Sequence, residues 1–274
     1  MLVTIAIVFL FIGVVAGVIG SIAGLGGGIF FVPALLFLAN MYMPGSMSPQ
    51  VATATSLLVI AVTALSSSIS YLKQKKVDIQ SALLFFIGSA PGAIVGVYVN
   101  TLLPIKSFSL LFGVFQLCMF ALLMFKDKIK PRNIDWQIKR QFVDNEGNEF
   151  EYGYSRWSAI LIAFFVGITS SLFGVGGGVL MVPAMMILFR FPPHIATATS
   201  MLVIFFSAVI GSATNILHDN VNWLYAAMLA PGAWAGGKLG AVAAGKMKGR
   251  TIVLVLRVLI LGIGIQMIVE SIVG

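Results

Sequence analysis

The chain has 274 residues, of which 59% are hydrophobic and only 9% are charged. Soluble globular proteins are about 45–50% apolar and about 25% charged, so this composition excludes a soluble domain and indicates an integral membrane protein. A net charge of +8 would suggest nucleic acid as the partner of a soluble protein. In a membrane protein, cationic loops instead hold the spans in their orientation, so we expect the lipid bilayer as a partner and no nucleic acid.

The apolar stretches, taken in chain order, predict the membrane spans. A helix needs about 20 apolar residues to cross the hydrocarbon. Two shorter apolar segments, 29–40 and 178–190, each follow a glycine cluster and reach only about 18–20 Å at 1.5 Å per residue, so we expect each to be the short arm of a hairpin bent at the glycines. The long candidates are roughly 2–23, 51–71, 79–99, 105–126, 157–173, 196–217, 221–244 and 251–272.

Half of the charged residues are concentrated in one segment of the chain. Of 26 charged residues, 13 lie between Lys126 and Arg156. We therefore interpret residues 127–156 as a polar loop between two membrane parts. The acidic residues in this loop and their basic neighbours indicate a solvated segment with a small hairpin at Asn145–Asn148.

Three motifs occur twice, in the same order. This duplication predicts two homologous halves, 1–126 and 157–274, joined by the polar loop. The matched pairs are Gly24–Gly28 with Pro33 and Gly174–Gly178 with Pro183, then Ala52–Ser56 and Ala196–Ser200, then Ala90-Pro91-Gly92 with Gly96 and Ala230-Pro231-Gly232 with Gly236.

The positive-inside rule decides whether the halves are parallel or inverted. With the polar loop in the cytoplasm, the basic residues at 73–76 are cytoplasmic too, but the matching loop at 218–220 has no Lys or Arg. The second half carries its basic residues one helix later, at 246–250, which a parallel repeat would place outside. An inverted repeat puts 14 of the 17 Lys and Arg residues in the cytoplasm. We predict an all-α, multi-pass bundle of two inverted repeats in the cell membrane, about five helices each, with both termini outside.

A run of three glycines interrupts an apolar segment in each half. Such breaks are costly in lipid unless they line a cavity, and broken helices in inverted repeats are typical of transporters. The helices that follow begin with free N–H groups and a positive dipole end, which favours an anion. The alternative is that the glycines only allow a turn or tight packing. The candidate substrate-binding glycines are Gly26, Gly27, Gly28, Gly176, Gly177 and Gly178.

The Thr/Ser runs lie near predicted helix starts, the first of which has Ser48 as N-cap and Pro49 as first helical residue. Their hydroxyls could donate to an anion, or each could bond its own helix backbone or a neighbouring helix. Lys238, inside 221–244, could supply a fixed positive charge or snorkel to the interface. The candidate hydroxyls are those of Thr53, Thr55, Ser56, Thr197, Thr199 and Ser200.

Glycines also recur at four-residue spacing in two predicted helices, which indicates small-xxx-small packing faces rather than a site. No nucleophile–base pair, metal-ligand spacing or carboxylate near the middle of the membrane is visible. We therefore expect no enzyme activity, no metal and no cofactor, and the oligomeric state, including a homo-oligomer, stays open. The two packing faces comprise Gly88, Gly92 and Gly96, and Gly232, Gly236 and Gly240.

The doubled pattern Gly-x-Gly-Gly-Gly-x-x-x-Val-Pro followed by Ala-Thr-x-Thr-Ser resembles the sulfite exporter TauE/SafE family. The pattern stands here at Gly24–Pro33 with Ala52–Ser56, and at Gly174–Pro183 with Ala196–Ser200. The resemblance covers nearly the whole chain except 127–156, a loop longer than is usual in the family. It implies a carrier of sulfite, sulfonates or other small sulfur-containing or organic anions.

These observations together predict a secondary transporter that moves a small anion, sulfite or a related sulfur oxyanion or sulfonate, out of the cell by alternating access. Backbone N–H groups of the glycine breaks and the Thr/Ser hydroxyls would hold the anion. The main alternative is an importer of thiosulfate or another organosulfur or organic anion. An intramembrane enzyme and a structural membrane protein are remote alternatives.

Overall fold

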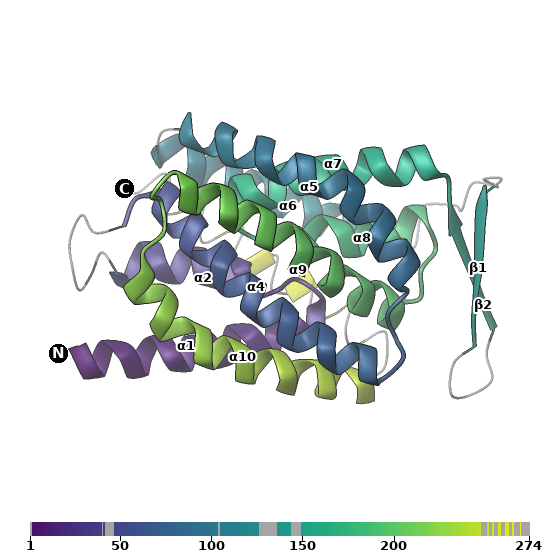
Figure 1. Cartoon of the computed structure of the whole chain (residues 1–274), viewed down its shortest axis with the longest axis horizontal. Helices are drawn as coiled ribbons and strands as arrows, with labels where there is room; N and C mark the ends of the chain where they lie inside the picture. The colour runs from purple at the N-terminus through teal and green to yellow at the C-terminus, as the bar shows by residue number, and fades with distance from the viewer. Residues whose placement is uncertain are drawn as a thin grey trace.

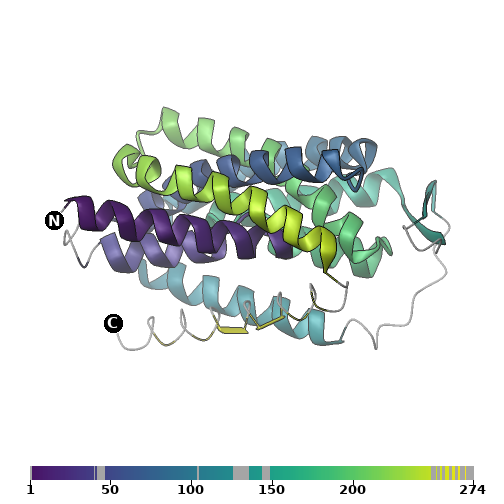
Figure 2. The ribbon, with the colours of Figure 1, turned by 90° about the horizontal axis from the view of Figure 1, so that it is seen from below.

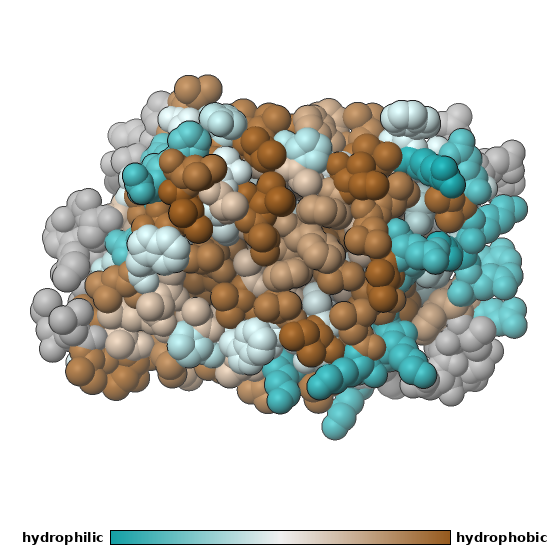
Figure 3. All heavy atoms as spheres, in the orientation of Figure 1, coloured by the Kyte–Doolittle hydropathy of each residue, from teal (hydrophilic) through white to brown (hydrophobic). Residues whose placement is uncertain are grey.

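The computed structural model describes residues 2–39, 41, 47–103, 105–125, 136–143 and 149–247, with scattered positions between 251 and 269. Within these residues the chain forms a bundle of helices along the long axis of the molecule, and a two-stranded sheet lies at one end (Figure 1). Apolar side chains cover the middle of the face seen in Figure 3, and hydrophilic ones gather toward the sheet end.

The helices follow the predicted order closely. In sequence they are α1 (Leu2–Ala23), α2 (Gly28–Ala34), the π-helical turn η1 (Leu35–Ala39), α4 (Pro49–Lys73), α5 (Ile79–Thr101), α6 (Ile105–Phe125), α7 (Arg156–Phe173), α8 (Gly178–Leu188), α9 (Pro193–Leu217) and α10 (Trp223–Lys246). Among the described residues, α1, α4, α5, α7 and α9 are long and apolar enough to cross a membrane, which makes this a multi-pass helical membrane protein. The predicted span 251–272 lies mostly outside the described residues.

Among the described residues, the departure from the all-α expectation is a pair of strands in the polar loop. Strands β1 (Ile138–Val143) and β2 (Glu149–Tyr154) pair antiparallel, so a hairpin forms around the predicted position. The turn at 144–148 lies outside the described residues. Aromatic residues occupy every second position of β2, and Phe150 of that strand lies opposite Phe142 of β1, a cross-strand pair that favours the hairpin.

Both glycine clusters break a helix, as predicted. Helix α1 ends at Ala23 and α2 begins at Gly28, while α7 ends at Phe173 and α8 begins at Gly178. In each break three glycines adopt the left-handed conformation that side chains with a Cβ rarely take. Their φ values run from 65° to 91°, at Gly24, Gly26, Gly27, Gly174, Gly176 and Gly177.

The small-residue faces pair the first helix of each half with a helix of the other half. Helix α1 lies beside α10 (Figures 1 and 2), and α7 beside α5. A Cβ at Gly92 would overlap with the carbonyl oxygen of Phe164, and one at Gly236 with that of Val14. The predicted packing role of these glycines is confirmed, because the helix backbones touch where side chains are missing.

These contacts correct the alignment of the third motif. A Cβ at Gly88 would overlap with the carbonyl oxygen of Ile160 in α7, and one at Gly232 with that of Leu10 in α1. Ile160 and Leu10 are equivalent positions, so the structure matches the glycines at 88, 92 and 96 with those at 232, 236 and 240. The expected pairing of Pro91 with Pro231 is therefore wrong by one helical turn. A pattern that repeats every four residues aligns equally well after a shift of four, so the sequence comparison aligned α5 with α10 four residues out of register.

One end of the bundle gathers several basic segments. Lys76, between α4 and α5, donates from Nζ to the carbonyl oxygen of Gly245 near the end of α10, at 3.0 Å. The hairpin reaches the same end, because Tyr152 donates to Asp78 beside Lys76. Helix α1 begins at the opposite end of the molecule (Figure 1).

Candidate functional site

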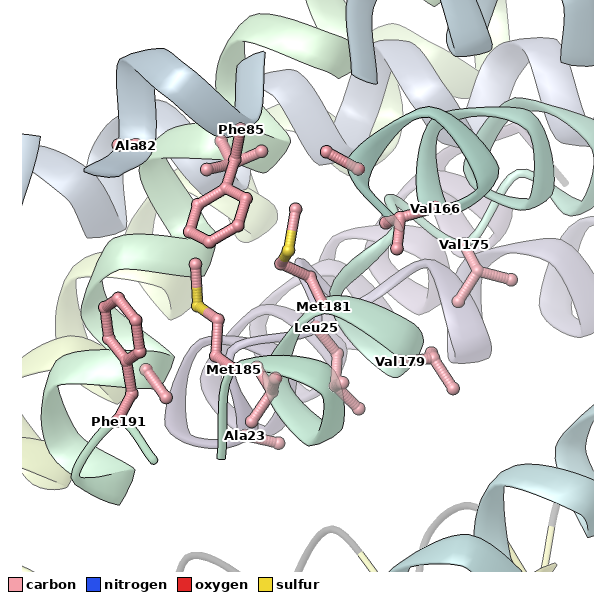
Figure 4. Packing of buried hydrophobic residues seen from close by; sticks show 14 of the residues in the cluster. Ala23, Leu25, Ala82, Phe85, Val166, Val175, Val179, Met181, Met185 and Phe191 are labelled. Atoms are coloured by element: carbon pink, nitrogen blue, oxygen red, sulfur yellow. The ribbon is translucent and has the colours of Figure 1, made fainter. Parts of the chain in front are cut away.

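The two glycine breaks meet each other inside the bundle. A Cβ at Gly28 would lie 2.5 Å from the carbonyl oxygen of Gly174, and one at Gly178 would overlap with the carbonyl oxygen of Gly24. We call the segments 24–28 and 174–178 the glycine turns. Leu25 and Val175 belong to one cluster of buried side chains with Val179 and Met181 (Figure 4). The turns are thus in backbone contact at a place where only glycine fits.

Two isoleucines cover both glycine turns. Ile60 of α4 and Ile204 of α9 are buried, and their Cγ2 atoms would lie 2.8–3.3 Å from a Cβ at Gly26 or Gly176. The side chains therefore touch both turns at once. The Ala-Thr-x-Thr-Ser helices α4 and α9 thus cross at the junction of the two halves.

The last serine of each Thr/Ser run forms a hydrogen bond with the glycine turn of the opposite half. Ser56 donates from Oγ to the carbonyl oxygen of Gly174 at 2.8 Å, and Ser200 donates to that of Gly24 at 3.0 Å. Each serine therefore fixes the turn of the opposite half. These two serines and the glycines predicted with them are brought together, but the hydroxyl hydrogens point at protein carbonyls.

The threonines have other partners. Thr53 and Thr197 donate to carbonyl oxygens of their own helices, at Gln50 and Pro193. Thr55 accepts a hydrogen bond from the backbone N–H of Asn222, the N-cap of α10, at 3.0 Å. Thr199 accepts one from the N–H of Asp78, the N-cap of α5, also at 3.0 Å. Thr53 and Thr197 therefore bond their own helix backbone, and Thr55 and Thr199 bond a neighbouring helix, which are the alternative roles considered for them.

Lys238 is not brought to the other predicted residues. It is exposed on α10, whereas Gly237 and Gly240 beside it face inward and are buried. An exposed cationic side chain on an apolar helix can reach the membrane interface with its flexible stem. This placement favours the snorkelling interpretation over a charge in the site.

A narrow cavity borders the second glycine turn, and sequence reasoning did not single out its serines. It lies between α5, α7, α8 and α9 and has room for about one water molecule. Three buried serines line it, Ser89, Ser170 and Ser207, together with Gly176 and Gly177. A serine in an apolar helix one turn before a glycine break, such as Ser170, is the signal that could have indicated it.

The hairpin contacts the end of α5 through Asp78. Tyr152 donates from its hydroxyl to Asp78 Oδ2 at 3.1 Å, and Ser81 donates to the same oxygen at 2.5 Å. The hydroxyl of Tyr154 lies 2.6 Å from that of Ser81, and Gly153 donates its N–H to Phe189 beyond α8. Burial and the neighbouring Asp78 carboxylate raise the pKa of Tyr152 well above its ordinary value, so the phenol stays protonated at neutral pH.

Comparison with known proteins places this architecture in a family. The model of the family described as Sulfite exporter TauE/SafE matches residues 9–267. The chain belongs to this family of membrane transporters. The resemblance found in the sequence motifs is confirmed.

Several relatives align over most of their length. The probable membrane transporter protein YunE of Bacillus subtilis is 48% identical over 268 residues, which cover 97% of this chain and 98% of that protein. Probable membrane transporter proteins of Xylella fastidiosa and Haemophilus influenzae are 29% identical over 236 residues and 26% identical over 245 residues. The first alignment covers 86% of this chain and 83% of the relative, and the second 88% and 86%. No solved structure matches the chain.

Proposed function

We propose that this member of the TauE/SafE family is a secondary transporter that exports a small anion, sulfite or a related sulfur oxyanion or sulfonate. The observation that carries the proposal is the meeting of two glycine turns inside an apolar bundle. Each turn is followed by a helix whose N-cap glycine, Gly27 or Gly177, makes no side-chain cap bond. Uncapped helix N-termini offer N–H groups and a positive dipole end to an anion.

The described acidic residues support an anionic substrate that is not coupled to a buried carboxylate. They are Asp78 and Asp219 at helix ends and Glu149 and Glu151 on the exposed hairpin. The Asp78 carboxylate accepts hydrogen bonds from Ser81 and Tyr152, and that of Glu151 accepts one from Gln141, so neither is bonded to a glycine turn. A negative interior would drive the anion outward by about 2.3 kcal/mol per charge per 100 mV, and about twice that for a dianion.

The proposed arrangement is two inverted repeats, 1–126 and 157–274, in the cell membrane. The hydrogen bond from Lys76 to Gly245 supports it, because it joins the basic segments of both halves at one end of the bundle. The positive-inside rule then puts this end and the 127–156 loop in the cytoplasm and the termini outside. Alternating access would tilt one half against the other around the glycine turns.

The proposal is tested with purified protein in liposomes. An imposed negative interior should drive sulfite out of loaded vesicles, and reversing the potential should reverse the flux. Vesicles with the Gly177→Val variant, in which a side chain would occupy the uncapped turn, serve as control. Transport of neither sulfite, thiosulfate nor a small sulfonate in either direction would overturn the proposal.

A further inference from the structure

The cavity beside the second glycine turn contains an unused hydrogen-bond donor. Ser170 of α7 is 2% exposed, and its Oγ has no hydrogen-bond partner in the structure. A buried hydroxyl without a partner is destabilising, so most buried hydroxyls in proteins are hydrogen-bonded. The same Oγ would lie 3.3 Å from a Cβ at Gly177, the N-cap of α8. The free hydroxyl and the uncapped helix start therefore line the same space.

Two more hydroxyls complete the lining. Ser89 of α5 and Ser207 of α9 form a hydrogen bond with each other at 2.6 Å. One of the two hydrogens serves that bond. Ser89 Oγ also donates to the carbonyl oxygen of Phe86, but at 3.4 Å this bond is long, so a ligand in the cavity can take the second hydrogen in its place. The remaining walls are mostly apolar and include Val166 and Met181, both labelled in Figure 4. None of the lining residues is charged.

At the corresponding place in the first half an aromatic ring lies beside the glycine turn. The repeat matches Ser170 with Gly20, Ser89 with Ala233, Ser207 with Thr63 and Met181 with Phe31. The Thr63 hydroxyl is buried and donates to the carbonyl oxygen of Val59 in its own helix. The ring of Phe31 is fully buried and would lie 3.0 Å from a Cβ at Gly27, where the second half has the serine instead. The two turns have similar backbones. The first also contacts a hydroxyl, that of Ser200, but this hydroxyl donates to the carbonyl oxygen of Gly24, whereas the Ser170 hydroxyl beside the second turn has no partner.

We infer that the substrate-binding site is one-sided: a small oxyanion binds beside the second glycine turn, held by Ser89, Ser170 and Ser207 and by the N-terminus of α8. This inference rests on the proposed transport of an anion and names its site. The Ser170 hydroxyl, one hydroxyl of the Ser89–Ser207 pair and the N–H groups at the start of α8 match the several acceptor oxygens of an oxyanion. An uncharged lining gives such a ligand hydrogen bonds without trapping it, as release requires.

The test measures binding separately from transport. Sulfite is added to purified protein in detergent, and the rise in Tm is compared with that given by chloride, which has no oxygen acceptors. Ser170→Ala should bind sulfite about tenfold more weakly, the loss expected for one hydrogen bond to a charged ligand. Its Tm without sulfite should not fall, because the lost hydroxyl has no partner.

Two variants serve as controls. Ser171→Ala removes the adjacent hydroxyl, which is also buried and without a partner but does not line the cavity, and should bind sulfite normally. Met181→Phe brings the first half's aromatic residue into the second half and should abolish the sulfite response. Equal sulfite affinity in the wild type, Ser170→Ala and Met181→Phe would overturn the one-sided site. If the same variants still exported sulfite normally from liposomes, the site would fail while the transport proposal stood.

Discussion

The two glycine turns are alike in backbone and different in surroundings. Each turn accepts a hydrogen bond from a serine of the opposite half, Ser56 or Ser200, and both turns touch the same two isoleucines. These contacts form a frame that the two turns share. Beyond this shared frame the first turn is packed against Phe31, whereas the second borders three serines. Neither turn of this frame can change alone, because each turn rests on the other. The side chains around it can diverge, and there the halves become unequal.

The largest effect should come from the shared frame. Gly28→Ala and Gly178→Ala each place a Cβ against the backbone of the opposite turn, so we expect both to lose about 3 kcal/mol or more of stability, or to fail to fold. Gly262→Ala is the control, since a Cβ there would meet no atom within 4 Å. Thermal unfolding in detergent measures the effect. If the protein tolerated the alanine in one turn but not in the other, the two turns would not be structurally equivalent.

The crossed serine bonds should come next. Ser56→Ala and Ser200→Ala each leave a buried glycine carbonyl without its donor, which costs about 1–3 kcal/mol. Tm should fall by a similar amount in both variants. Ser68→Ala, which removes a buried hydroxyl that has no partner in the structure, should leave Tm unchanged or slightly raised. A loss confined to one of the two serines would show that only one crossed bond matters.

The hairpin sharpens the difference between the two halves. Asp78 and Asn222 are equivalent N-caps, and only Asp78 is contacted by the hairpin. Asp78→Asn keeps a capping side chain but removes the charged acceptor of Tyr152 and Ser81, so about 1–2 kcal/mol should be lost. Asn222→Asp should change the free energy of unfolding by only a few tenths of the amount expected for Asp78→Asn. Faster proteolysis of the hairpin in Asp78→Asn would report its release.

The smallest effect should appear with pH. The pKa of Tyr152 is raised above its ordinary value of 10.0 by burial and by Asp78, so the folded state holds this proton more tightly than the unfolded state. Its contribution to stability is complete below pH 10 and is lost as the pH rises above that value. Tyr152→Phe should therefore flatten the fall in Tm between pH 9 and pH 11 relative to the wild type. Identical pH profiles would contradict this account.

Much of the fold could be predicted from the sequence, because its strongest signals are local. Apolar length predicted the helices, the glycine runs predicted the breaks, and Ser48 caps α4 as expected by accepting from Val51. The alignment of α5 with α10 failed because a four-residue glycine period does not fix its own register. The hairpin was predicted, but its contact with Asp78 could not be.

The candidate site was only partly predictable. The glycines and Ser56 and Ser200 do lie together, since their motifs are local and duplicated. The cavity serines come from three different helices, and no spacing along the chain relates Ser89, Ser170 and Ser207. Exposure of Lys238 likewise depends on which face of α10 packs against its neighbours. These features follow from tertiary packing, which a single sequence does not display.

The exchange of partners between the halves has a consequence for biogenesis. Helix α1 is synthesised first, yet its partner α10 begins only at Trp223. The carbonyl oxygen of Gly24 likewise gains its serine donor only when Ser200 has been synthesised. A nascent first half therefore sits in the membrane with its small-residue stripe and its bent backbone uncovered, and contacts this distant in sequence form slowly. The two halves would therefore assemble in one late step. A chain severed in the polar loop should be active only when both pieces are made together.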